Sequence, residues 1–142
     1  MTIAAILRGK GQEVVSVRPD QPVREAIALL AERRIGALPV MDGETVTGIF
    51  SERDVIYCLK TGELTVLDRP VAEVMTTPAI TVAPDDAVMG ALSLMTRRRI
   101  RHLPVIDGGR MVGVVSIGDL VKYRIDKVEA DAAAMREYIQ QA

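Results

Sequence analysis

Two segments of the chain place a serine three residues before an aspartate, Ser51 with Asp54 and Ser116 with Asp119, each directly after an apolar run. This spacing puts both side chains on the first turn of a helix. Backbone N–H groups left unpaired at a helix start attract anions, and a nearby carboxylate accepts hydrogen bonds from ribose hydroxyls, so the pattern suits a nucleotide. The same spacing defines a capping box, in which the side chains only close the helix end. The tetrapeptide alone favours the cap, and both interpretations are compatible.

A cluster of basic residues precedes the second segment. Residues 97–101 are four arginines and one isoleucine, and His102, the only histidine, follows them. Such runs usually end a helix and complement its dipole, the role we assign to Arg97, Arg98 and Arg99. A single imidazole has no partner for acid–base catalysis or metal binding, and no nucleophile stands beside a base. We therefore expect no enzyme, no catalytic residue and no metal site.

These residues belong to an internal repeat. Val17–Ile56 superimposes without a gap on Val82–Val121, an offset of 65 residues (82 − 17). The identities run through turns as well as apolar positions, which indicates two copies of one supersecondary unit. They include Leu38-Pro39-Val40 with Leu103-Pro104-Val105, and Asp42-Gly43 with Asp107-Gly108.

Each copy predicts the same elements, in an α/β (α+β) fold. A β-branched run (14–17; 80–82) precedes an amphipathic helix, two strands flank an Asp-Gly turn, and a second helix begins near Glu52 or Ile117. The order is strand, helix, hairpin, helix. We divide the chain into an amino-terminal lead (1–13), unit 1 (14–61), a linker with a short helix at Val71–Met75 (62–78), unit 2 (79–123) and a carboxy-terminal amphipathic helix (124–142).

The composition narrows the classes of function. The 142 residues are 49% hydrophobic and carry a formal net charge of −1, so little electrostatic attraction draws nucleic acid or a membrane surface. Aromatic residues are only 3%, so a bound ring would rest against aliphatic side chains. One cysteine, no leader-like segment and no long apolar run lead us to expect a cytoplasmic protein with no membrane segment.

The phrases IGALPVMD and VTGIFSERDV in the first copy, and IRHLPVID and MVGVVSIGDL in the second, resemble the CBS domain, named for cystathionine β-synthase. The hydrophobic-Pro-Val strand and the Gly-x-x-Ser/Thr-x-x-Asp segment each occur twice, and the resemblance spans Val14 to Tyr123. It implies a stand-alone bacterial CBS pair, two units packed pseudo-symmetrically in one module, and a homodimer of modules. It also implies clefts that bind AMP, ADP, ATP, NAD or S-adenosylmethionine and signal by a conformational change.

By this resemblance Thr81 and Ser16 meet the purine or ribose, and Arg101 and His102 face the phosphate. The first copy has Gly36 and Ala37 at the latter positions, without a side-chain donor, so we expect a weaker site there unless Arg53 substitutes. The predicted site of unit 2 is Ile80, Thr81, Arg101, His102, Leu103, Pro104, Ser116 and Asp119. The weaker site of unit 1 is Ser16, Ala37, Ser51, Arg53 and Asp54.

The carboxy-terminal helix leaves a second function open. Its apolar residues recur at helical spacing without a partner in either repeat, so it must pack on the amino-terminal segment or on a second subunit. They are Ile125, Val128, Ala132, Met135 and Ile139. The alternative function is therefore an oligomerisation or docking scaffold, or a regulatory subunit, with vestigial clefts.

Overall fold

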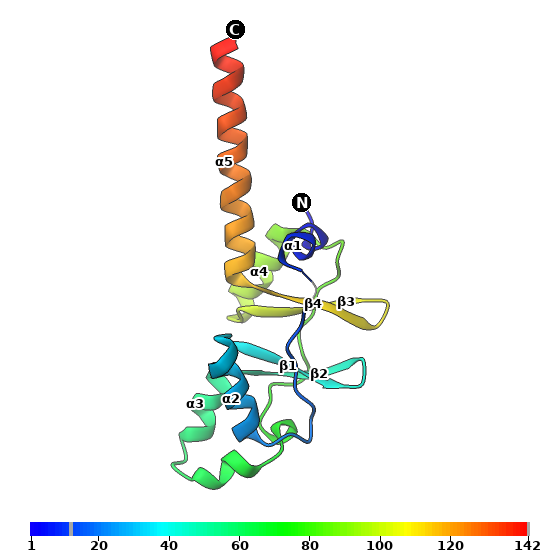
Figure 1. Cartoon of the computed structure of the whole chain (residues 1–142), viewed down its shortest axis with the longest axis vertical. Helices are drawn as coiled ribbons and strands as arrows, with labels where there is room; N and C mark the ends of the chain where they lie inside the picture. Colours follow the sequence, from blue (N-terminus) through cyan, green and yellow to red (C-terminus); the bar gives the residue numbers. More distant parts are fainter. Residues whose placement is uncertain (12, 142) are drawn as a thin grey trace.

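The computed structural model describes residues 1–11 and 13–141; residues 12 and 142, within the predicted first and last segments, lie outside the described residues. Figure 1 shows two similar units stacked along the long axis of the molecule, with one helix projecting from the end. The helices are α1 (Ile3–Lys10), α2 (Val23–Arg33), α3 (Glu52–Leu59), α4 (Val88–Arg98) and α5 (Ile117–Gln141). The strands are β1 (Ala37–Asp42), β2 (Thr45–Ser51), β3 (His102–Asp107) and β4 (Arg110–Ser116), and the linker that joins the units in sequence contains two 3₁₀ helices, η1 (Leu64–Asp68) and η2 (Val71–Glu73).

Each unit contains one antiparallel hairpin, as predicted. β1 pairs with β2 and β3 with β4 in equivalent registers, with a bulge at the same place in both. Gly43 and Gly108 adopt positive φ angles of 61° and 58° in the turns, a conformation that glycine adopts without strain. The hairpins lie one above the other with their turns on the same side (Figure 1).

The predicted first strand of each unit is much shorter than expected. It is reduced to one parallel bridge, Val17 with Val40 or Val82 with Val105. In a parallel ladder the next hydrogen bond toward the amino terminus would need the N–H of Pro39 or Pro104, and proline has none. Pro39 in β1 and Pro104 in β3 therefore end the parallel pairing with the first strand of their unit.

Two separate apolar cores hold the units together. The core of unit 1 gathers the buried faces of α2, β1, β2 and α3, with Val66 and Val71 from the linker. The core of unit 2 gathers α4, β3, β4 and the start of α5, with Ile3, Ile6 and Leu7 from α1. Each unit is therefore completed by the segment that precedes the other unit. The short helix predicted at Val71–Met75 is the 3₁₀ helix η2, and η1 was not predicted.

Helix α5 leaves the body of the molecule. Leu120 in its first turn is fully buried, whereas residues 124–141 are all exposed. Figure 1 shows the helix extending past α1, so the amino-terminal segment does not cover its apolar residues. None of the helices in the described parts of the chain has the length and hydropathy needed to cross a membrane.

Candidate functional site

The two Ser-Asp pairs do cap their helices. The N–H of Ser116 donates to Asp119 Oδ2 at 2.9 Å, and the N–H of Asp119 donates to Ser116 Oγ at 3.1 Å. Ser51 and Asp54 form the equivalent capping box, with the Ser51 N–H 2.8 Å from Asp54 Oδ2. The capping interpretation is therefore confirmed for both pairs, and a ligand role has to be judged from what else the carboxylates contact.

Asp54 is satisfied within the fold. It is buried, at 6% exposed, and its Oδ1 accepts a hydrogen bond of 2.9 Å from the Thr76 hydroxyl. It lines an outer hollow of unit 1 beside Tyr57 and Cys58. Burial of the Cys58 thiol, followed by the negative charge of Asp54, raises the pKa of that thiol. Asp54 therefore acts as a structural carboxylate.

Asp119 has a different partner. The ammonium group of Lys10, at the end of α1, lies 2.7 Å from Asp119 Oδ2 and 2.8 Å from the carbonyl oxygen of Val114. Burial by itself would raise the pKa of Asp119, but the hydrogen bonds from Lys10 and from the Ser116 backbone, with the Lys10 charge, lower it overall. A ribose that approached this carboxylate would have to compete with an ion pair.

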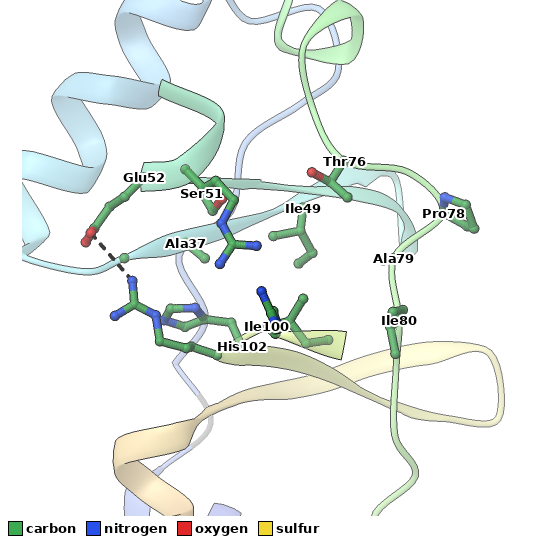
Figure 2. A pocket seen from close by; sticks show the side chains of 14 residues that line it. Ala37, Ile49, Ser51, Glu52, Thr76, Pro78, Ala79, Ile80, Ile100 and His102 are labelled. Carbon is green, nitrogen blue, oxygen red and sulfur yellow. Dashed lines mark ion pairs between the residues drawn. The ribbon is translucent and has the colours of Figure 1, made fainter. Parts of the chain in front are cut away.

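Two cavities lie between the units. The first, cavity A, has a volume of about 140 Å³. Unit 1 lines it with Ala37, Ser51, Glu52 and Arg53, and unit 2 with Ile80, Arg99, Ile100, Arg101 and His102. Figure 2 shows Ile49 and Ile80 on its walls, with His102 below Ala37 and Glu52 at its edge, directed toward the other unit.

The second, cavity B, is the pseudo-symmetric equivalent, with a volume of about 330 Å³. Most of its walls are formed by residues 65 positions away from those of cavity A. Arg34 occupies the position in cavity B that Arg99 occupies in cavity A, and Ser116 occupies that of Ser51. The position equivalent to Arg101 is Gly36. The Lys10 of the Asp119 ion pair also lines it, and His102 borders both cavities. Cavity A thus holds the larger set of cationic side chains.

The cavities group the predicted site residues differently from the sequence-based grouping by unit. Ile80 and Arg101 share cavity A with Ser51 and Arg53 of unit 1, rather than with Ser116 of their own unit, and Asp119 lines neither cavity. His102 and Ala37 line both cavities. Because the units face each other, the strand start of one lies opposite the helix start of the other. Ser16 and Thr81 are exposed and line neither cavity, while Leu103 and Pro104 are buried in strand β3 and also line neither cavity.

Three cationic residues of the cavities were not predicted as site residues. Arg99, assigned to a helix end, does follow α4, but it adopts a left-handed conformation and lines cavity A. Arg34 does the same after α2 and lines cavity B. The repeat offset pairs these two arginines and could have indicated them; for Lys10, 109 residues before its aspartate, the sequence holds no comparable signal.

The charges of cavity A are partly balanced across the unit boundary. Arg101 Nη2 lies 3.9 Å from Glu52 Oε2, a pair drawn dashed in Figure 2. Burial, followed by the positive charge of Arg101, lowers the pKa of His102, so the imidazole is neutral at pH 7. Within residues 1–11 and 13–141, no three His, Cys, Asp or Glu side chains converge on a metal-binding position. Cavity A is therefore a hollow with aliphatic walls and a cationic edge.

The family model described as "CBS domain" matches the chain twice, over residues 11–61 and 71–126. The chain belongs to the CBS-domain family. The two CBS matches correspond to the two units of the structure, and the resemblance seen in the sequence is confirmed together with the α/β fold of two packed units.

Known CBS proteins of similar length are related to this chain. The CBS domain-containing protein YhcV of Bacillus subtilis is 31% identical over 121 residues, which cover 85% of this chain and 86% of YhcV. A putative signal-transduction protein with CBS domains from Burkholderia ambifaria has a structure that superimposes with a TM-score of 0.82, at 40% identity, covering 89% of this chain and 95% of that one. The structure of CBSX2 in complex with AMP superimposes with a TM-score of 0.76 at 26% identity, covering 88% and 96%.

Proposed function

We propose that this CBS pair is a regulatory module, not an enzyme, that binds an adenosine-containing ligand between its units and passes the occupancy on as a change of conformation. The observation that carries the proposal is cavity A, which combines aliphatic walls with the cationic side chains of Arg53, Arg99 and Arg101. Such a site suits a purine with attached phosphate in a chain that has few aromatic residues. The AMP complex of the related CBSX2 supports the class of ligand.

We assign the stronger phosphate site to cavity A and a weaker site to cavity B. The phosphate would meet Arg99, Arg101 and His102, with Arg53 opposite, and the purine would rest against Ile49 and Ile80. Cavity B offers Arg34, Ser116 and Lys10, and the charge of Lys10 is already paired with Asp119, which does not line the cavity. The volume of cavity A is below the roughly 300–1,000 Å³ typical of small-molecule sites, so binding would separate the walls or leave part of the ligand at the mouth. This separation is the proposed signal.

Calorimetry with AMP, ATP, NAD and S-adenosylmethionine tests the proposal. We expect at least one of them to bind more tightly than about 1 mM, which corresponds to about −4 kcal/mol. If none does, the sensor function is overturned and the scaffold function is favoured.

A matched pair of substitutions tests the assignment of the two cavities. Arg99→Gly and Arg34→Gly remove equivalent cations from cavities A and B at left-handed positions where glycine is at least as favourable, so neither change should impair folding. We expect Arg99→Gly to weaken AMP binding about tenfold and Arg34→Gly to leave the tighter site nearly unchanged. Equal effects of the two substitutions would contradict the assignment.

We also propose that the protein is cytoplasmic and forms a homodimer of CBS pairs. Its single cysteine is buried and unpaired, which fits a reducing compartment. The exposed apolar residues of α5 support self-association. Fractionation of the source cells and the molar mass of the purified protein by light scattering test the two statements separately.

A further inference from the structure

The outer part of α5 carries a narrow apolar face that nothing else in the described chain covers. Six apolar or small residues follow one another at alternating intervals of four and three residues. The first is 42% exposed, and the other five lie in the run 124–141, where every residue is exposed. They are Val121, Ile125, Val128, Ala132, Met135 and Ile139. Alternation of four and three is a repeat of seven residues, the pattern of a coiled-coil seam rather than of a helix packed broadly on a core.

The charges beside this seam favour one orientation. With Ile125, Ala132 and Ile139 at the a positions, Arg124 and Asp131 occupy g positions, and Glu129 and Arg136 occupy e positions. In a parallel pair of helices, a g residue faces the e residue five positions further along the other helix. Arg124 then faces Glu129 and Asp131 faces Arg136 of the second copy, and both contacts join opposite charges.

An antiparallel pair of α5 helices that overlap over the same residues lacks this charge complementarity. There e positions face e positions and g positions face g positions, so Glu129 would meet Glu129, and Asp131 would meet Asp131, of the second copy. Among the described residues of one chain, Asp131 has only an exposed pair, 3.6 Å from Lys127, which leaves it available to a further cation. Charge therefore selects a parallel pair.

We propose that residues 121–141 of α5 form a parallel two-stranded coiled coil with α5 of a second copy of this chain. Figure 1 shows the helix projecting beyond α1 and α4, and residues 124–141 are all exposed, so two copies can align along this length with a two-fold axis parallel to the helices. The inference deepens the proposed homodimer by naming its seam. It does not depend on whether the cavities bind nucleotide.

Disulfide mapping tests the seam and its direction. Ala132, Ala133 and Ala134 are adjacent alanines at a, b and c positions, so they offer a matched series. In a Cys58→Ala background, Ala132→Cys should form a disulfide-linked dimer under mild oxidation, while Ala133→Cys and Ala134→Cys should cross-link at least about tenfold more slowly. Equal rates at the three positions, or no cross-link at Ala132, would overturn the parallel seam.

A charge exchange in the wild-type cysteine background gives an independent test, should Cys58→Ala disturb folding. Arg124→Glu or Glu129→Arg alone should raise the dimer dissociation constant about two- to tenfold, and the double exchange should restore it. The readout is sedimentation equilibrium of the full chain. A dimer insensitive to all three changes would contradict the seam while leaving a homodimer through the units; a wild-type monomer would contradict both.

Discussion

Lys10 and Thr76 contact the two helix caps in equivalent places, but with different chemistry. The Thr76 hydroxyl bonds the buried Asp54, while Lys10 places an ammonium group on the more exposed Asp119. The first contact is a neutral donor to a carboxylate inside the fold, and the second is an ion pair that solvent and salt can screen. The two units of the repeat therefore close their caps with unequal sensitivity to salt.

Lys10→Met should lower the free energy of unfolding by about 0.5–1 kcal/mol at pH 7, a small value because Lys10 is 40% exposed. The pKa of Asp119 is lowered in the folded chain, so its pairing stabilises the fold above the ordinary value of 3.8, and this contribution is lost as pH falls through the lowered pKa. Urea unfolding at pH 7 and pH 3 measures the difference between wild type and variant. A difference as large at pH 3 as at pH 7 would contradict the ion-pair account.

Glu52→Gln should strengthen the binding of AMP severalfold. The Glu52 carboxylate lies 3.9 Å from Arg101 in the free protein, where it competes with a phosphate for the same guanidinium. Calorimetry with AMP and with adenosine separates this effect from a general change of the cavity, because adenosine has no phosphate and its affinity should not change. An equal gain for both ligands would show that Glu52 acts by closing the cavity.

At the scale of the element, each hairpin needs a glycine where another segment crosses it. A Cβ on Gly48 would lie 2.8 Å from the backbone oxygen of Thr76, whereas a Cβ on Gly113 would lie 2.7 Å from the terminal Cδ2 of Leu7. A side-chain end can rotate away, but the Thr76 backbone is held by two hydrogen bonds to Ile49. The two glycines are equivalent in the repeat and differ in how freely their neighbours can move.

Gly48→Ala should therefore cost more stability than Gly113→Ala, about 3 kcal/mol against about 1 kcal/mol, since overpacking is costly where the neighbour cannot move. Urea unfolding of the two variants under identical conditions measures the difference. The reverse order would show that the strand pairing near Thr76 adjusts more easily than the packing of α1.

At the scale of the whole molecule, the two units exchange their covering segments. Helix α1 precedes unit 1 but buries Ile3, Ile6 and Leu7 in the core of unit 2, and the linker buries Val66 and Val71 in unit 1. The exchange ties the two cores together through the chain. A signal that opens the space between the units would also act on α1.

Leu7→Ala should destabilise unit 2 selectively. Truncation of a buried leucine costs about 2–4 kcal/mol through lost burial and the cavity left behind. Hydrogen exchange should show reduced protection of β3, β4 and α4, with less change in β1, β2 and α2. Val66→Ala, in the linker, serves as the reciprocal control and should affect unit 1. Equal loss in both units after either change would mean that they unfold as one cooperative body.

The sequence alone determined the repeat, the hairpins, the helix caps, the amphipathic faces and the family, because these follow from local pattern: spacing along the chain, turn glycines and capping residues. Tertiary structure decided which residues share a cavity, since the strand start of one unit meets the helix start of the other only after the units pack face to face. It also decided the partner of Asp119, a lysine 109 residues away, and the loss of the first strands beside proline. Contacts at such separations depend on how two units close on each other, which no local pattern encodes.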